Sequence, residues 1–266
     1  MTLTKKLRNA IETETGCKVY GNLIMLPDGD LYPLPLVKGN KKIGKVWHAS
    51  TLPTNKTITA YVNGEKLEMI GTCPMTCDGC YGVNGCYGYN SVKYILMRRT
   101  AFLRKYPDVY FTVARLQIIH QNIKKIRIHV TGDFIENEAM GWYKIFKEFP
   151  YLKGWTYTKC NIDGDLEMLD GLHNFNIVKS VIKGCGFNFG HIDYIMALYE
   201  KLTQDGENVY ICRCGVDPDQ HCDNCCGCSD HDRVLFIEHG TGYKAIEDPL
   251  YNTIKALINS QPSQAI

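Results

Sequence analysis

The sequence predicts an α/β fold, a complete or partial (β/α) barrel preceded by an N-terminal β-hairpin elaboration. Three observations favour this class. β-type runs alternate with helical stretches after Lys125, turn signals recur before residue 70, and a length of 266 residues suits one such domain. Repeated β–α units imply a parallel sheet. We expect residues 1–70 to form the elaboration and residues 71–266 to form the α/β domain.

Each expected element follows from a local pattern. Asn63-Gly64 separates TITAYV from EKLEMI and supplies the positive φ angles of a hairpin turn. Ser91 suits the N-cap of a helix over 91–104, and Pro107 suits the start of a helix over 108–122. The later strands are IRIHV, GWTYT, FNIVKSVI, NVYICR and RVLFIE, and the helices that alternate with them are expected at 137–149, 165–172, 192–203 and 249–259.

Composition restricts the class of protein. A hydrophobic content of 45% and a charged content of 22% are typical of a globular chain, and a net charge of +2 does not by itself indicate a nucleic-acid or membrane partner. Residues 1–16 have no apolar segment of the secretory type, and no run approaches the roughly 18 apolar residues of a membrane span. We expect a cytoplasmic protein with no membrane partner, which acts on a small molecule or a nucleic acid. The oligomeric state is not predicted.

The cysteines indicate metal binding. Ten of the 13 cysteines lie in two short segments, residues 73–86 and 212–228. A disulfide framework is not expected in a reducing compartment, where clustered cysteines favour metal sites. The other three are expected to be small buried hydrophobic residues; they are Cys17, Cys160 and Cys185.

The first segment has the composition of an iron–sulfur loop. Several thiolates must converge on one cluster, and the glycines between these cysteines let a loop wrap around it. Zinc also accepts four thiolates, but its ligands usually come as two pairs separated by a longer gap, which is missing here. We therefore predict a 4Fe-4S cluster in the domain of residues 71–266, with candidate ligands Cys73, Cys77, Cys80 and Cys86.

The second segment allows two kinds of centre. Its Cys-x2-Cys-x2-Cys spacing matches three ligands of a second 4Fe-4S cluster, and one of two preceding cysteines would be the fourth. Zinc is equally compatible, because thiolates and imidazoles are available for a tetrahedral site. The candidate ligands are Cys212, Cys214, Cys222, Cys225, Cys228 and His239, with His231 as a further imidazole.

The Cys-x3-Cys-x2-Cys motif of residues 73–80 resembles the cluster-binding signature of the radical S-adenosylmethionine superfamily. Members of that superfamily are built on a full or partial (β/α) barrel. The resemblance implies S-adenosylmethionine as cosubstrate, bound at strand ends by Gly132, Asp133 and Ser180. Radical chemistry needs one iron without a protein ligand. If Cys86 is a ligand, the cluster is instead structural or an electron relay.

A longer set of residues runs in order from about residue 70 to 240. It consists of Thr72-Cys73-Pro74, Cys80, Cys86-Tyr87, the run from Ile128 to Phe134, Trp142, Tyr157-Thr158-Lys159 and His239-Gly240. This order resembles the gene product 88 family of phages and mobile elements. The resemblance implies a fold and a metal centre more than a reaction.

A third resemblance concerns the late cysteines alone. Cys212-Arg213-Cys214, a later cysteine and His239 follow the order of the zinc site in base-exchanging transglycosylases, which are (β/α) barrels that modify nucleic acid. The resemblance implies a zinc-dependent nucleic-acid base-modifying enzyme as an alternative. A non-catalytic, metal-stabilised binding module is the third hypothesis.

Polar residues follow two predicted strands at the ends where barrel enzymes form their sites. Asp133 suits a general base, and equally a turn aspartate that caps the next helix. Lys159 would reach an anionic substrate or water. These two residues are the catalytic candidates. His129 alternates with apolar neighbours, so we expect a core histidine that hydrogen-bonds to backbone.

Overall fold

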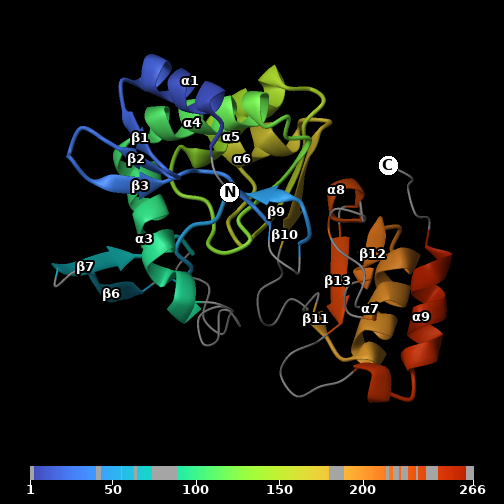
Figure 1. Cartoon of the computed structure of the whole chain (residues 1–266). Coiled ribbons are helices and arrows are strands. Elements are labelled where there is room, and N and C mark those ends of the chain that lie inside the picture. Colours follow the sequence, from blue (N-terminus) through green and yellow to red (C-terminus); the bar gives the residue numbers. More distant parts are fainter. Residues whose placement is uncertain are drawn as a thin grey trace.

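The computed structural model consists of two lobes (Figure 1). It describes residues 3–39, 43–54, 56–62, 65–73, 89–179, 189–213, 216–217, 222, 227–231, 233–237 and 245–261. The N-terminal lobe contains α1 (Lys5–Thr15), β1 (Lys18–Tyr20), β2 (Leu23–Met25), β3 (Leu31–Pro33), β4 (Val37–Lys38), β5 (Trp47–His48), β6 (Thr57–Val62), β7 (Glu65–Ile70), α3 (Tyr89–Lys105), α4 (Pro107–His120), β8 (Lys125–Ile128), α5 (Glu138–Glu148), β9 (Lys153–Thr158), α6 (Gly164–Asp170) and β10 (Phe175–Lys179). The C-terminal lobe contains β11 (Phe189–Gly190), α7 (Ile192–Gln204), β12 (Val209–Ile211), α8 (Gly227–Asp230), β13 (Arg233–Ile237), the 3-10 helix η2 (Ala245–Glu247) and α9 (Tyr251–Ser260).

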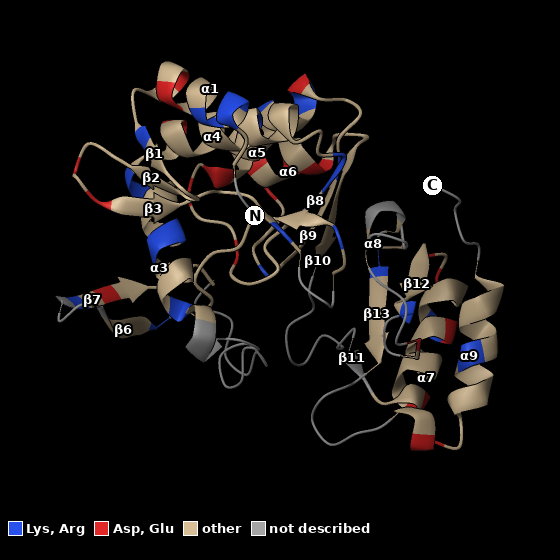
Figure 2. Cartoon of the chain, viewed as in Figure 1, with Lys and Arg blue, Asp and Glu red and all other residues tan. Residues whose placement is uncertain are grey.

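The main sheet has five strands in the order β10-β9-β8-β5-β4. Strands β5, β8, β9 and β10 are parallel, and β4 pairs with β5 in the antiparallel direction. Along β8, buried Ile126 and Ile128 alternate with partly exposed Lys125 and Arg127, the two-residue period of a strand with different faces. Along β8, one face is therefore apolar and the other, which we call the charged face, carries Lys125 and Arg127; Figure 2 colours the positions of Lys and Arg in blue.

Helices cover the apolar face. Figure 1 shows α1, α4, α5 and α6 stacked on one side of the main sheet. Leu7 and Ile11 of α1 are fully buried in the same core cluster as Trp142 of α5 and Ile126 of β8. Burial of large side chains of this kind is the main favourable term in folding, about 1.5–3 kcal/mol for each fully buried side chain. The N-terminal segment thus shares the core of the parallel sheet.

The C-terminal lobe has a second, smaller sheet. Its three strands are parallel and lie in the order β11-β13-β12. Helices α7 and α9 pack on it around buried Ile195, Leu235 and Ile254. The short helix α8 joins the lobes, because Nδ2 of Asn176 on β10 donates to the backbone oxygens of Cys228 at 2.9 Å and His231 at 2.8 Å.

The α/β class is confirmed, together with the predicted alternation of strands and helices from β8 to α9. The Asn63-Gly64 hairpin is also confirmed by the antiparallel pairing of β6 with β7, although the turn itself lies outside the described residues. The described strands form four separate sheets and no closed barrel. The expected boundary at residue 70 falls at the end of β7, and helix α1 was not predicted within the β-rich part. Within the described residues, no helix has the length and apolar content to span a membrane.

Candidate functional site

The site lies where the parallel strands β8 and β9 end. The chain leaves β8 through residues 129–133 and leaves β9 at Lys159, while Thr72 and Cys73 follow the end of β7. Carboxyl ends of parallel strands are where α/β proteins form their binding sites. Segments that are far apart in the sequence therefore meet at one edge of the sheet.

Asp133 is the centre of a buried network at this edge. Asp133 is only 3% exposed. Oδ1 accepts hydrogen bonds from the hydroxyl of Thr158 at 2.5 Å and from the backbone N–H of Phe134 at 2.9 Å. Oδ2 accepts from the backbone N–H of Lys159 at 2.8 Å. The carboxylate thus ties the end of β9 to the loop that follows β8.

Thr72 connects this carboxylate loop to the first cysteine segment. Its hydroxyl oxygen accepts the backbone N–H of Asp133 at 2.8 Å and lies 2.9 Å from the hydroxyl of Thr51. Both threonines are buried. We refer to Thr51, Thr72, Asp133, Thr158 and the backbone of Lys159 as the Asp133 network.

Gly132 allows Thr51 and Thr72 to pack closely against the backbone of the network. Its φ angle is +85°, a region that side chains with a Cβ rarely adopt. A Cβ at this position would meet the side-chain oxygens of Thr51 and Thr72. The glycine predicted to bind a cosubstrate is thus packed against two hydroxyl groups of the network.

His129 and Glu138 form an ion pair beneath the network. Nε2 of His129 lies 3.0 Å from Oε1 of Glu138, and both side chains are completely buried. Burial, the largest single influence, lowers the pKa of His129. The charge and hydrogen bond of Glu138, the charge of Asp133 and a backbone hydrogen bond with Thr131 together outweigh burial, so the pKa is raised above its usual value. The indole N–H of Trp142 also donates to Glu138 at 3.1 Å. The expectation of a core histidine that hydrogen-bonds to backbone is consistent with its burial and its backbone hydrogen bond with Thr131, and the carboxylate of Glu138 is a partner that was not predicted.

This pair predicts a pH-dependent stability. Because the folded chain holds the His129 proton more tightly than the unfolded chain, the stabilisation is present below about pH 6.5 and is lost as the pH rises through the folded pKa. We expect the free energy of unfolding, measured by urea titration, to fall across this interval. Glu138→Gln is expected to flatten the profile, and replacement of exposed His173 is expected to leave it unchanged. An identical profile in Glu138→Gln would contradict the assignment.

Cys73 lies beside the network, and its sulfur has a backbone donor. The N–H of Thr54 donates to Sγ of Cys73 at 3.3 Å, while the N–H of Cys73 donates to the oxygen of Thr54 at 3.2 Å. Hydrogen bonds to the sulfur are typical of cysteines that ligate iron–sulfur clusters. Cys160 differs, because burial and then the charge of Asp133 raise the pKa of its thiol to about 11.

The second cysteine segment contacts strand β9 on the face opposite the one that contacts Asp133. The phenol of Tyr157 on β9 donates to Sγ of Cys228 on α8 at 2.7 Å. Cys212, directly after β12, belongs to the same apolar cluster as Cys228 and Tyr157. Two of the predicted ligands of the second centre, Cys212 and Cys228, are thus brought together against β9.

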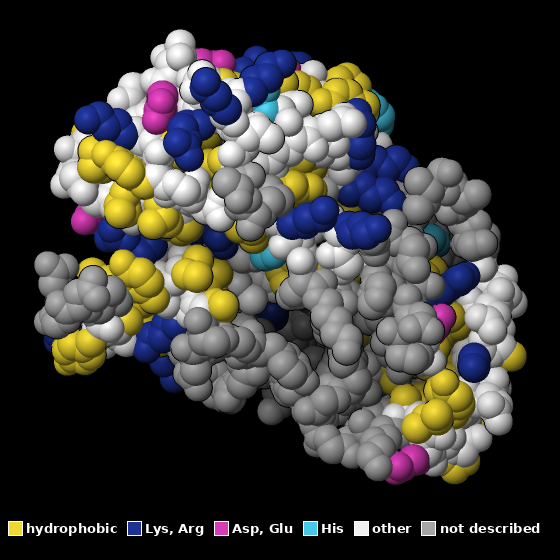
Figure 3. Space-filling view, viewed as in Figure 1, with side chains coloured by type: hydrophobic (Ala, Val, Ile, Leu, Met, Phe, Trp, Pro, Cys, Tyr) yellow, Lys and Arg dark blue, Asp and Glu magenta, His cyan; other side chains and the backbone are white. Residues whose placement is uncertain are grey.

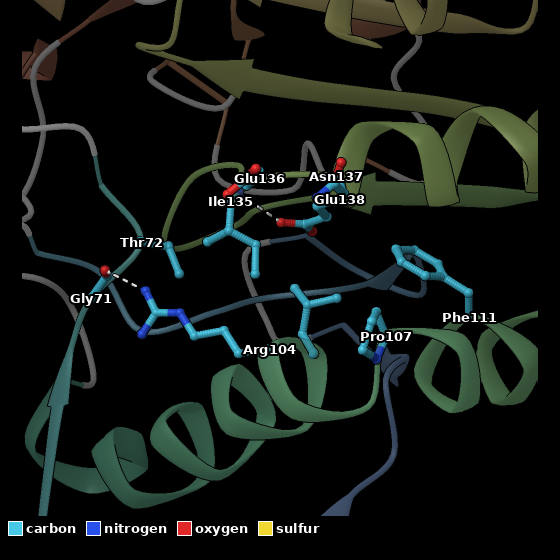
Figure 4. Close-up of a pocket in the computed structure, with 10 residues that line it drawn as sticks. Gly71, Thr72, Arg104, Pro107, Phe111, Ile135, Glu136, Asn137 and Glu138 are labelled. Carbon is cyan, nitrogen blue, oxygen red and sulfur yellow. Dashed lines mark hydrogen bonds between the residues drawn. The ribbon is translucent and has the colours of Figure 1, made fainter.

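A surface hollow adjoins the network. Its volume is about 510 Å³, and Thr72, Arg104, Phe111 and Glu138 are among the residues that line it. In Figure 4, Arg104 donates to the carbonyl of Gly71, at 2.9 Å from Nη2, so its guanidinium is held at the rim. The hollow has both charged and apolar walls, a combination common in small-molecule sites.

Several predicted site residues lie outside the described part of the chain. They are Cys77, Cys80, Cys86, Ser180, Cys214, Cys225 and His239. Among the described residues, no group of three His, Cys, Asp or Glu side chains is arranged to hold a metal ion. Of the catalytic candidates, Asp133 is buried in the network, and Lys159 joins it through its backbone N–H.

Sequence reasoning did not assign three side chains to this site. Thr72 was named only within the family pattern, directly before the first cysteine. Glu138, in the first turn of α5, had the signal of an acidic residue at a helix start, which also fits an ordinary cap. Thr51 lies in a short segment after β5, and we find no sequence signal for it.

Comparison with known families gives a match over most of the chain. The family model described as Gene product 88 matches residues 34–239, which include the Asp133 network and the described part of both cysteine segments. No curated protein and no solved structure matches the chain.

Proposed function

The chain belongs to the gene product 88 family, and from this premise we propose that it is an iron–sulfur metalloprotein of a phage or mobile element. In this proposal it is a radical S-adenosylmethionine-like enzyme with a second cysteine-rich metal centre. Cys73, Cys77 and Cys80 would hold a 4Fe-4S cluster. Cys86 would either remain off the cluster or close it as the fourth ligand.

One observation supports this proposal above the others. Thr72, next to the first cysteine, accepts the backbone N–H of Asp133 at 2.8 Å, and this loop is bonded in turn to the end of β9. A cofactor bound through Cys73 would therefore lie at the carboxyl edge of the parallel strands. This is the edge at which a (β/α) barrel or a partial barrel binds its ligands.

The described cysteines fit ligands of such a group. Cys73 receives a backbone N–H and Cys228 receives a phenol O–H, both at the sulfur. Donors of this kind stabilise a thiolate and tune the potential of a bound cluster. When bound, a four-iron cluster supplies one-electron transfer.

The residues around the cluster would position it and the cosubstrate. Both oxygens of Asp133 already accept hydrogen bonds, so Asp133 would act by fixing the loop of Gly132 and the backbone of Lys159. Ser180 would bind the cosubstrate from the end of β10, and the Lys159 side chain would face an anionic substrate. The second centre, at Cys212 and Cys228 with their neighbours in the sequence, would be auxiliary.

The test is reconstitution with iron and sulfide under nitrogen, followed by metal analysis and EPR of the reduced protein. We expect bound iron and sulfide, an EPR signal that changes when S-adenosylmethionine is added, and formation of 5′-deoxyadenosine. A cluster whose signal does not change, with no 5′-deoxyadenosine, would exclude the radical reaction but retain a structural or electron-relay cluster.

Cys73 is the residue to replace, because it is the candidate ligand of the first cluster that lies within the described residues. Cys73→Ala is expected to lose the iron of one cluster, about four atoms per chain. Cys17→Ala is the matched control, because Cys17 is a buried cysteine of the α1–β1 connection and outside both segments. Equal iron contents in the two variants would contradict the assignment of Cys73 as a ligand.

A zinc site is the second candidate for the late segment, because Cys212 and Cys228 lie in one cluster and zinc also accepts thiolate ligands. Zinc there, with no iron elsewhere and salt-dependent binding of DNA or RNA, would support the nucleic-acid base-modifying enzyme. Unfolding upon metal removal, with no turnover, would instead support a metal-stabilised binding module.

A further inference from the structure

The charged face of the main sheet contains two buried hydrogen-bond donors that have no described partner. These donors are Nε of Arg127 on β8 and Nε1 of Trp155 on β9. Trp155 is 3% exposed. A buried donor without an acceptor costs about 1–3 kcal/mol, so native proteins rarely retain one without a reason. Two such donors on adjacent strands indicate a missing acceptor.

The sheet register brings these donors together. Arg127 and Trp155 are direct partners in the parallel pairing of β8 with β9, and Arg127 is also the partner of His48 on β5. Side chains of directly paired residues stand on the same face of a sheet, about 5 Å apart. The guanidinium carbon of Arg127 lies 5.0 Å from the ring centroid of Tyr157, which holds the guanidinium against the sheet.

The surroundings of these donors are positively charged. No described carboxylate forms an ion pair with Arg127. Burial, followed by the charges of Arg99 and Arg127, lowers the pKa of neighbouring His48 to about 3, so this histidine is neutral near pH 7. Lys125 and Lys153 are paired on the same two strands. Figure 3 shows Lys and Arg side chains gathered along the part of the N-terminal lobe that faces the C-terminal lobe.

We propose that Arg127 and Trp155 bind an oxyanion, the carboxylate or phosphate group of a small molecule, on the charged face of the main sheet. Arginine suits this role because its planar fork donates two parallel hydrogen bonds to such a group. The indole N–H of Trp155 adds a third donor. The site depends on neither cysteine segment for its ligands, and it goes beyond the metal chemistry proposed above. Tyr157 contacts both Arg127 and Cys228, so the bound anion would lie next to the second cysteine segment.

The indole N–H resonances provide a direct test. The chain has three tryptophans, Trp47, Trp142 and Trp155, so protein labelled with 15N-tryptophan gives three indole signals. The full-length protein, purified under nitrogen, is titrated with sodium phosphate and separately with sodium acetate at constant ionic strength. We expect a saturable shift of the Trp155 signal, identified by its loss in Trp155→Phe. The Trp142 signal is expected to remain in place, because this indole already donates to Glu138.

Variants separate specific binding from general attraction. Arg127→Lys is expected to weaken the apparent affinity about tenfold, because the paired donors are lost while the charge remains. Lys153→Gln is the control, since it removes an exposed positive charge from the next strand and leaves both donors intact. Saturation by phosphate alone or by acetate alone would identify the group. No saturable shift with either anion would overturn the proposal and leave buried water as the partner, and an equal loss in the two variants would also overturn it.

Discussion

Asp133→Ala is expected to lower the free energy of unfolding by at least about 3 kcal/mol, because each buried donor left without an acceptor costs about 1–3 kcal/mol. The carboxylate accepts from the Thr158 hydroxyl and from the backbone N–H groups of Phe134 and Lys159, and it is 3% exposed. Urea denaturation followed by tryptophan fluorescence measures the loss. Asp133→Asn is expected to lower the free energy of unfolding less than Asp133→Ala, because the amide oxygen can still accept hydrogen bonds. Some loss is still expected, because the amide NH2 group would face a donor.

The control for this prediction is Asp163→Ala. Asp163 precedes α6, is exposed, and makes no side-chain capping hydrogen bond. Its replacement is expected to change stability by less than about 0.5 kcal/mol, as at most surface positions. If Asp133→Ala and Asp163→Ala were equally stable, the Asp133 network would not hold the loops together.

Gly132→Ala is expected to destabilise the chain by about 2–5 kcal/mol. About 1–3 kcal/mol would come from the backbone conformation, and the remainder from contact of the new methyl group with its neighbours. The φ angle is +85°, and the added Cβ would meet the hydroxyl oxygens of Thr51 and Thr72. Because Thr72 precedes Cys73, the variant is also expected to reduce the iron bound after reconstitution. Thermal unfolding and iron analysis on the same preparation measure both effects.

Gly206→Ala separates these two contributions. Gly206 has a similar φ angle of +81°, but a Cβ added there has open space around it. The difference between the two alanine variants therefore measures the clash within the network alone. Equal destabilisation at the two positions would show that the packing against Thr51 and Thr72 contributes nothing.

The sequence predicted local structure better than it predicted the arrangement of strands. The strand after Lys124 and the hairpin around Asn63-Gly64 depend on neighbouring residues, and the structure confirms β8 and the antiparallel pairing of β6 with β7. Strand order depends on contacts between distant segments, which periodicity does not encode. The placement of β13 between β11 and β12 illustrates this, since sequential β–α units would place β12 next to β11.

The candidate site was predicted in some of its residues but not in its contacts. Asp133 was singled out because it follows a strand and a glycine, and the structure places it at the expected edge. Its partners Thr72 and Thr158 lie 61 and 25 residues away in the sequence. No spacing rule links such residues, because the fold alone brings them together. The unpartnered donors of Arg127 and Trp155 were missed for the same reason.

The end of β9 contacts the second cysteine segment and the Asp133 network through neighbouring residues. Consecutive residues Tyr157 and Thr158 point to opposite faces, one toward Cys228 and the other toward Asp133. Because these two residues are neighbours in β9, a single peptide bond separates the contact with α8 from the contact with the loop of Asp133. The same two residues of β9 therefore anchor parts of the chain that lie on opposite faces of the sheet.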